Sequence, residues 1–187
     1  KFAKYNSIKN VKFLNADIFD DVMSDNYFDF IWTNGVLHHT KDPKKAFEMC
    51  VSALKKEGYI LVGLYNSIGR IRTKIRKYIY KIFGKRAVIF LDPVLRNLKS
   101  DSPDQIEAWI RDQYEHPVES THTIDEVLDW FDQNNIEFLN SIPNCNFDLN
   151  VSNNLFSKQE RGNFFSRLVS QIIMLFNYLG DDGGLFV

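Results

Sequence analysis

The feature that most constrains this chain is an almost uniformly apolar run, Phe28–Thr33, which ends directly in a polar segment with a histidine pair, Asn34–Thr40. An apolar strand without alternation is typical of a parallel sheet, because helices cover both of its faces. In an open α/β sheet, ligands bind beyond the carboxyl ends of the strands. We therefore expect a ligand site directly after this run.

Two further apolar segments end in polar residues. Val11–Leu14 precedes a polar stretch that includes Asp17, and Tyr59–Tyr65 is followed by Asn66. Between the second and third segments, Asp42-Pro43 predicts the start of a helix, since aspartate caps helices and proline suits the first helical position. A strand, a helix and a strand in this order predict a parallel crossover unit.

Helical periodicity and capping signals predict further elements along the chain. One helix is expected to end near residue 8, and the helix that starts at Asp42-Pro43 is expected to end at Gly58. Two more are expected over Ile68–Ile82 and Phe164–Leu179, and two others are expected to start at Ser102-Pro103 and at Thr123. The other expected strands are Ile136–Ile142 and Leu185–Val187, the latter after a turn at Gly180–Gly184.

Size and composition limit the classes of protein that the chain can belong to. Its 187 residues suit one domain with a sizeable core, and a net charge of −1 gives no overall attraction to nucleic acid or anionic membranes. Cys50 and Cys145 lie far apart, which indicates neither a disulfide framework nor a metal site. The absence of a long apolar run predicts no transmembrane segment and favours a cytoplasmic location.

This ordered set of segments resembles the second half of a class I S-adenosylmethionine-dependent methyltransferase. The specific part runs from Asp29 through His39 and continues with Asp42-Pro43 and Leu54–Tyr59. The resemblance implies an α/β fold with a Rossmann-like sheet in the order 3-2-1-4-5-7-6, in which strand 7 is antiparallel. The five expected strands of this chain take the places of strands 3 to 7, and residues 66–122 form a helical insertion between strands 5 and 6.

The template also has features without a counterpart here. The chain contains no GxG motif, so the glycine-rich loop after strand 1 is absent, as is the acidic residue after strand 2. We therefore interpret residues 1–187 as a partial methyltransferase domain that lacks strands 1 and 2. Alone, this fragment is expected to be inactive and not to bind S-adenosylmethionine measurably. The alternative is a non-catalytic, methyltransferase-like binding or scaffold domain.

The resemblance implies a cofactor site at the ends of strands 3 and 4. Asp17 would accept a hydrogen bond from the adenine amino group, and the backbone N–H of Ile18 would meet the adenine ring. Asn34 and Gly35 would lie beside the methionine part of S-adenosylmethionine, since glycine allows a close approach. The alternatives are an aspartate that caps its own turn and a plain turn between strand and helix.

Three histidines are candidate general bases. The resemblance places His38 and His39 where acceptors approach, and a histidine near neutral pH can take a proton from an attacking hydroxyl or amine. His116 lies in the polar segment Asp112–His122, which would lid the acceptor pocket. The alternatives are a packing role for one of the adjacent histidines and a solvated loop around Pro117.

Eight basic residues and no acidic residue lie from Arg70 to Arg86. The simplest interpretation of this segment is a solvated helix face. The more specific interpretations are that it binds an anionic acceptor or a membrane surface. Nucleic acid is less favoured, because few aromatic residues are interleaved. The candidate substrate-binding residues are Arg70, Arg76, Tyr114 and Glu119. The predicted reaction is methyl transfer to an oxygen or nitrogen of a small or carrier-linked acceptor.

Overall fold

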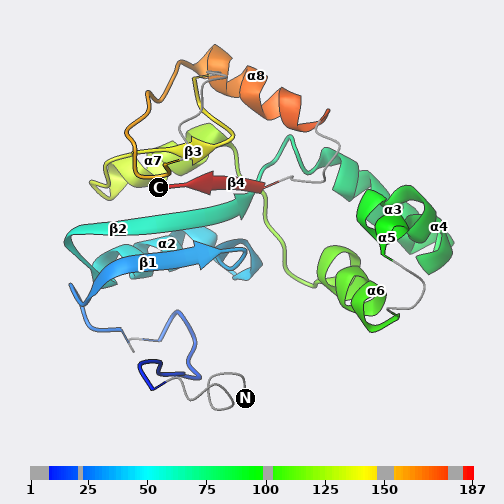
Figure 1. Ribbon diagram of the computed structural model, residues 1–187, viewed down its shortest axis with the longest axis horizontal. Helices are drawn as coiled ribbons and strands as arrows, with labels where there is room; N and C mark the ends of the chain where they lie inside the picture. The colour runs from blue at the N-terminus through cyan, green and yellow to red at the C-terminus, as the bar shows by residue number, and fades with distance from the viewer. Residues whose placement is uncertain (1–8, 21–22, 99–102, 147–153, 177–182) are drawn as a thin grey trace.

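The computed structural model describes residues 9–20, 23–98, 103–146, 154–176 and 183–187 and shows a mixed α/β fold (Figure 1). Within these residues a four-stranded sheet has the order β1-β2-β4-β3. β1 (Phe28–Asn34) is parallel to β2 (Leu54–Tyr65), and β4 (Gly183–Phe186) is antiparallel to both β2 and β3 (Ser141–Ile142). This is the order of strands 4, 5, 7 and 6 in the methyltransferase template.

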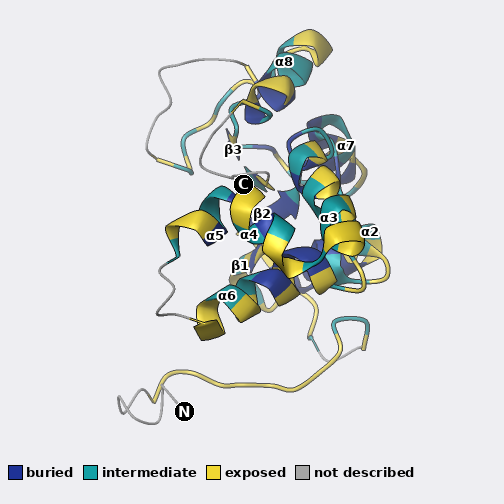
Figure 2. Ribbon diagram, turned by 90° about the vertical axis from the view of Figure 1, so that its right-hand side faces the viewer, coloured by how far each residue is buried: buried dark blue, intermediate teal, exposed yellow. Residues whose placement is uncertain are grey.

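The segment Val11–Leu14, expected as strand 3, is not a strand in the structure. It is part of the exposed stretch near the N-terminus in Figure 2, where Phe13 and Leu14 are 80% and 82% exposed. A strand needs a neighbour for its backbone N–H and C=O groups, and β1 pairs only with β2 among the described residues. The interpretation of this segment as strand 3 is therefore wrong for this structure.

The crossover from β1 to β2 runs through η1 (Leu37–His39) and α2 (Pro43–Ala53). As predicted, Asp42 caps α2, because its carboxylate accepts a hydrogen bond from the backbone of Lys45 at 3.0 Å. The helix ends before Gly58, since the backbone already becomes extended at Leu54, which pairs with Phe28. The pairing of β1 with β2 is irregular here, because Phe28 pairs with Leu54 and Phe30 already pairs with Tyr59, so the residues between Leu54 and Tyr59 form a bulge.

The main core lies between the sheet and the two helices α2 and α7 (Ile124–Gln133). Phe47 of α2 and Phe131 of α7 stack with their ring centroids 5.6 Å apart, so the two helices pack on the same face of the sheet. The opposite face of β1 is open, with Trp32 60% exposed. The expectation that helices cover both faces of this strand is therefore wrong within the described residues.

Short helices form a group beyond the carboxyl end of β2 (Figure 1). They are α3 (Ile71–Phe83), α4 (Lys85–Leu91), α5 (Pro93–Asn97), α6 (Pro103–Ile110) and η2 (Arg111–Glu115). They enclose a second apolar cluster of Val88, Leu95, Ile110 and Tyr114. No described helix has the length and apolar character that crossing a bilayer requires.

The C-terminal part contains α7, β3, α8 (Phe164–Met174) and β4. The predicted cap of α7 is confirmed, because the Thr123 hydroxyl accepts a hydrogen bond from the backbone of Glu126 at 3.1 Å. The strand expected over Ile136–Ile142 is reduced to its last two residues. The helix expected at residues 1–8 lies outside the described residues, as do the end of the helix expected to reach Leu179 and most of the turn at Gly180–Gly184.

Candidate functional site

The candidate site lies where β1 and β2 end. After β1, Gly35 takes a left-handed conformation with φ of 74°, and η1 then turns one histidine inward and the next outward. A loop from the helical segment lies against this turn, because the backbone N–H of Ser120 donates to the carbonyl oxygen of His38 at 2.9 Å. Beside it, the backbone N–H of His122 donates to the carbonyl of Tyr65 at 2.8 Å. The site is thus assembled from three separate parts of the chain.

His38 is the inward histidine and is only 1% exposed. Its ring lies on Tyr65 with the centroids 3.9 Å apart, and neither ring nitrogen has a hydrogen-bond partner among the described residues. Burial, followed by the nearby positive charges of His39 and Arg70, lowers the pKa of His38 to about 3. His38 is therefore neutral near pH 7 and a weaker base than an ordinary histidine.

The low pKa of His38 predicts a loss of stability in acid. Between the ordinary histidine pKa of about 6.5 and the folded value of about 3, the unfolded chain binds more protons than the folded chain. The free energy of unfolding should therefore fall with decreasing pH, by about 1.4 kcal/mol per pH unit from this group. Urea denaturation at a series of pH values should show this slope and its loss in His38→Gln. The matched control His116→Gln should keep it, and a slope that persists in His38→Gln would contradict the prediction.

His39 and His116 meet although 77 residues separate them in the sequence. Their ring centroids lie 3.9 Å apart, and both Nδ1 atoms face the carbonyl oxygen of Val118, at 3.0 Å and 2.6 Å. Since a carbonyl oxygen only accepts, each Nδ1 donates its hydrogen, and each neutral ring therefore has its basic lone pair on Nε2. This arrangement suits a general base.

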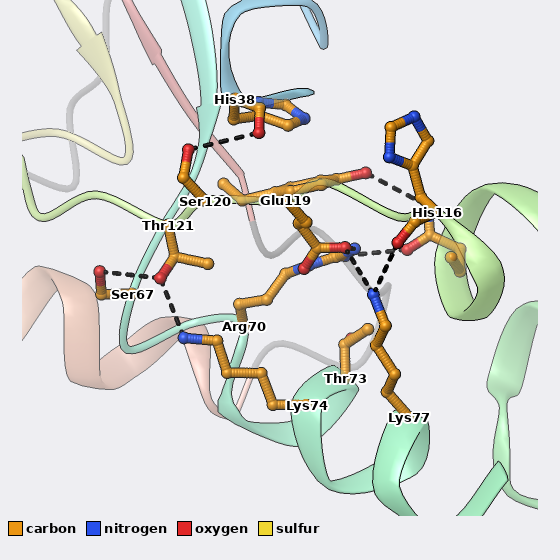
Figure 3. A network of polar contacts seen from close by, with 12 residues as sticks. His38, Ser67, Arg70, Thr73, Lys74, Lys77, His116, Glu119, Ser120 and Thr121 are labelled. Carbon is orange, nitrogen blue, oxygen red and sulfur yellow. Dashed lines mark hydrogen bonds and ion pairs between the residues drawn. The ribbon is translucent and has the colours of Figure 1, made fainter. Parts of the chain in front are cut away.

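A buried ion pair between Arg70 and Glu119 lies near His38 and His116 (Figure 3). The Arg70 guanidinium is 1% exposed and donates to both carboxylate oxygens of Glu119 at 3.1 Å, and also to Gln113 at 2.8 Å. It covers the ring of Tyr65 at 3.5 Å. Burial would raise the pKa of Glu119, but the hydrogen bonds and positive charges of Arg70 and Lys77 outweigh it and lower this pKa. The two predicted substrate residues Arg70 and Glu119 thus bind one another.

The two other predicted substrate residues lie in the helical group. The Tyr114 hydroxyl donates to Asp92 at 2.5 Å, and burial together with this bond raises the pKa of Tyr114. Arg76 donates to Thr73 at 2.7 Å. No hydrogen bond, ion pair or ring contact joins Tyr114 or Arg76 to the histidine pair in the described part of the chain.

The predicted cofactor residues lie in two segments, the turn that contains Asp17 and Ile18 and the end of β1. Asp17 is exposed and accepts a hydrogen bond from the backbone of Phe19 at 2.9 Å. This bond corresponds to the alternative interpretation, in which the aspartate caps its own turn. Lys41, just after η1, lies 4.7 Å from the centre of the Phe19 ring and so connects this turn to the loop that follows β1. Ile18 packs against the main core.

Asn34 and Gly35 form the end of β1. The Gly35 N–H donates to the carbonyl of Gly63 at 3.2 Å, and no atom lies within 4 Å of where a Gly35 Cβ would be, so a ligand can approach this backbone closely. A Cβ at Gly63 would collide with the side chain of Asn34. Gly63 was not among the predicted site residues, although a glycine inside a buried strand is a signal for such a close approach.

Tyr65 and Gln113 were also missed. Tyr65 contacts His38 and Arg70, and its position at the end of an apolar strand was the available signal. Gln113 accepts from Arg70 and donates to the Tyr65 hydroxyl at 3.3 Å, and nothing in the sequence pattern singled it out. No group of three or more potential metal-binding side chains occurs in the part of the chain that the structure describes.

Comparisons with known proteins agree with this geometry. Residues 1–62 match the family model described as a methyltransferase domain. The structure of PKMT2 from Rickettsia typhi is similar over 99% of this chain, with a TM-score of 0.65 and 16% identity, and the same protein in complex with AdoHcy gives a TM-score of 0.66 and 14% identity. An uncharacterized protein of Synechococcus sp. is 24% identical over 148 residues, which are 69% of this chain.

These matches confirm the predicted resemblance to class I S-adenosylmethionine-dependent methyltransferases, and the structural matches show the fold. The chain spans only part of these relatives: 36% of the Synechococcus protein and 39% to 40% of the two Rickettsia structures.

Proposed function

We propose that this chain is part of an enzyme that transfers the methyl group of S-adenosylmethionine to an oxygen or nitrogen of a small or carrier-linked acceptor. The observation that carries the proposal is the His39–His116 pair, in which each ring donates from Nδ1 to Val118 and keeps a basic lone pair on Nε2. His39 lies within residues 1–62, which match the methyltransferase family model. In this proposal residues 66–122 are an insertion that lids the acceptor pocket.

The residues at the end of β1 fit S-adenosylmethionine. The backbone at Gly35 has open space beside it, and Asn34 is fixed against Gly63 at the same place. One oxygen of Asp17 accepts from Phe19, which leaves the other carboxylate oxygen for the adenine amino group. When bound, the cofactor supplies an electrophilic methyl group on a sulfonium.

The side chains of this chain would orient the acceptor and remove its proton. His39 Nε2 accepts the proton of the attacking hydroxyl or amine, while Val118 holds its Nδ1–H in place. The Arg70–Glu119 pair fixes the Val118 loop, and most of the rate enhancement comes from positioning the acceptor. Arg70 and Glu119 would act on the acceptor only by holding this loop, whereas Arg76 and Tyr114 would stabilise the helical group through their bonds to Thr73 and Asp92.

The cofactor assignment predicts a defect in binding. In the full-length protein, Asp17→Ala should weaken S-adenosylmethionine binding by about 1–3 kcal/mol, because the adenine amino group loses its acceptor. Isothermal titration calorimetry would measure this as a Kd increase of about 5- to 150-fold. Asp20→Ala, which removes a nearby exposed carboxylate, is the control and should leave Kd unchanged. Equal affinities of Asp17→Ala and the wild type would eliminate the adenine role.

A further inference from the structure

α3 differs from an ordinary surface helix in that several of its apolar residues are exposed while polar residues face inward. Its inner side makes polar contacts, since Thr73 is buried and Lys77 contacts Glu119 at 3.5 Å, while Tyr80 hydrogen-bonds to Glu115 and packs its ring against the second apolar cluster. A helix on a soluble protein normally turns its apolar stripe toward the core. Here the polar side of α3 faces the candidate site.

Four apolar residues of α3 face outward. Ile71, Ile75, Tyr78 and Ile82 follow one another at intervals of four, three and four residues and therefore lie on one side of the helix. All four are exposed, for example Ile75 by 55% and Tyr78 by 67%, and exposed residues run along α3 in Figure 2. We call these four residues the outer face of α3.

The charge around the outer face is positive. Lys81, Lys85 and Arg86 are exposed next to Ile82, as is Phe83, and no acidic residue occurs from Arg70 to Arg86. Lys85 forms an ion pair with Glu107, whereas no ion pair of Lys81 or Arg86 is found in the described part of the chain. Apolar side chains with a tyrosine and a basic border match the interface of a bilayer that contains anionic lipids.

We propose that the outer face of α3 docks on an anionic lipid surface. The isoleucines and Tyr78 enter the boundary between headgroups and acyl chains, and Lys81 and Arg86 contact the lipid phosphates. Because Lys77 on the inner side of the same helix contacts Glu119, docking would place the candidate site close to the membrane. This inference does not depend on methyl transfer.

Vesicle sedimentation with the full-length protein tests the proposal. Vesicles of phosphatidylcholine with about 30% phosphatidylglycerol should bind the protein, and pure phosphatidylcholine vesicles should not. Lys81→Gln/Arg86→Gln should lower the partition coefficient about 25-fold, at about fivefold for each basic residue. Ile75→Ser/Ile82→Ser should lower it at least about 10-fold.

Matched variants control for charge and for exposed isoleucines. Lys12→Gln/Lys56→Gln removes two exposed charges elsewhere, and Ile172→Ser/Ile173→Ser removes two exposed isoleucines of α8, so both should bind like the wild type. Equal loss in a control and its partner variant would overturn the proposal, as would absence of binding to the anionic vesicles. A dimer in sedimentation velocity that Ile75→Ser/Ile82→Ser dissociates would instead show that a second copy covers this face. RNA binding that only the charge variant weakens would assign the face to nucleic acid and overturn the lipid proposal.

Discussion

Replacing His39 by asparagine should lower turnover about 10²- to 10⁴-fold, the usual contribution of a general base, while cofactor affinity stays close to that of the wild type. Asparagine keeps a donor that can reach the Val118 carbonyl oxygen but has no lone pair of comparable basicity. The measurement is the rate of S-adenosylhomocysteine formation, with any acceptor that the wild type methylates. Calorimetric titration of the cofactor separates loss of chemistry from loss of binding.

The pH dependence gives a second readout of the same prediction. A general base acts only when it is unprotonated, so the wild-type rate should rise with pH. His39→Asn should abolish this rise. His116→Asn is the matched variant, because its ring also donates to Val118. Full activity of His39→Asn together with a slow His116→Asn would assign the base to His116, and full activity of both would eliminate general-base catalysis.

The central part of the fold could be predicted from the sequence. The apolar runs at Phe28–Thr33 and Tyr59–Tyr65 and the cap at Asp42-Pro43 predicted β1, β2 and the start of α2, because strong local patterns and core packing agree there. Val11–Leu14 has an equally apolar pattern but no partner strand among the described residues. A strand depends on its neighbour, and the local sequence carries no information about that neighbour.

The site was predictable only in part, for a similar reason. The polar strand end after β1 indicated Asn34, Gly35 and the histidine pair, since sheet topology fixes where strands end. The approach of His116 to His39 depends on how a loop 77 residues further along the chain folds back, and spacing in the sequence does not determine this. Arg70 was expected to bind an anionic acceptor because it belongs to the basic run at the start of the insertion, but it is buried and donates to a carboxylate and an amide of the chain itself.

That burial leads to the largest expected effect on stability. Glu119→Ala should lower the free energy of unfolding by about 3–5 kcal/mol, because it leaves the buried guanidinium of Arg70 without its carboxylate. Chemical denaturation of the full-length protein would measure the loss. Asp29→Ala breaks the ion pair between the exposed side chains of Lys55 and Asp29 and should change stability little.

A double variant separates the ion pair from the space that it fills. Arg70→Met/Glu119→Leu replaces both charges by apolar side chains of similar length, so no buried charge is left without a partner. We expect most of the stability lost in Glu119→Ala to return in this variant, since desolvation of an unpaired charge is the main cost. Its turnover should be lower than that of the wild type, because the apolar pair no longer holds the Val118 loop through the hydrogen bond to Gln113 and the ion pair with Lys77. A double variant as unstable as Glu119→Ala would show that packing in this region, rather than the unpaired guanidinium, determines the loss.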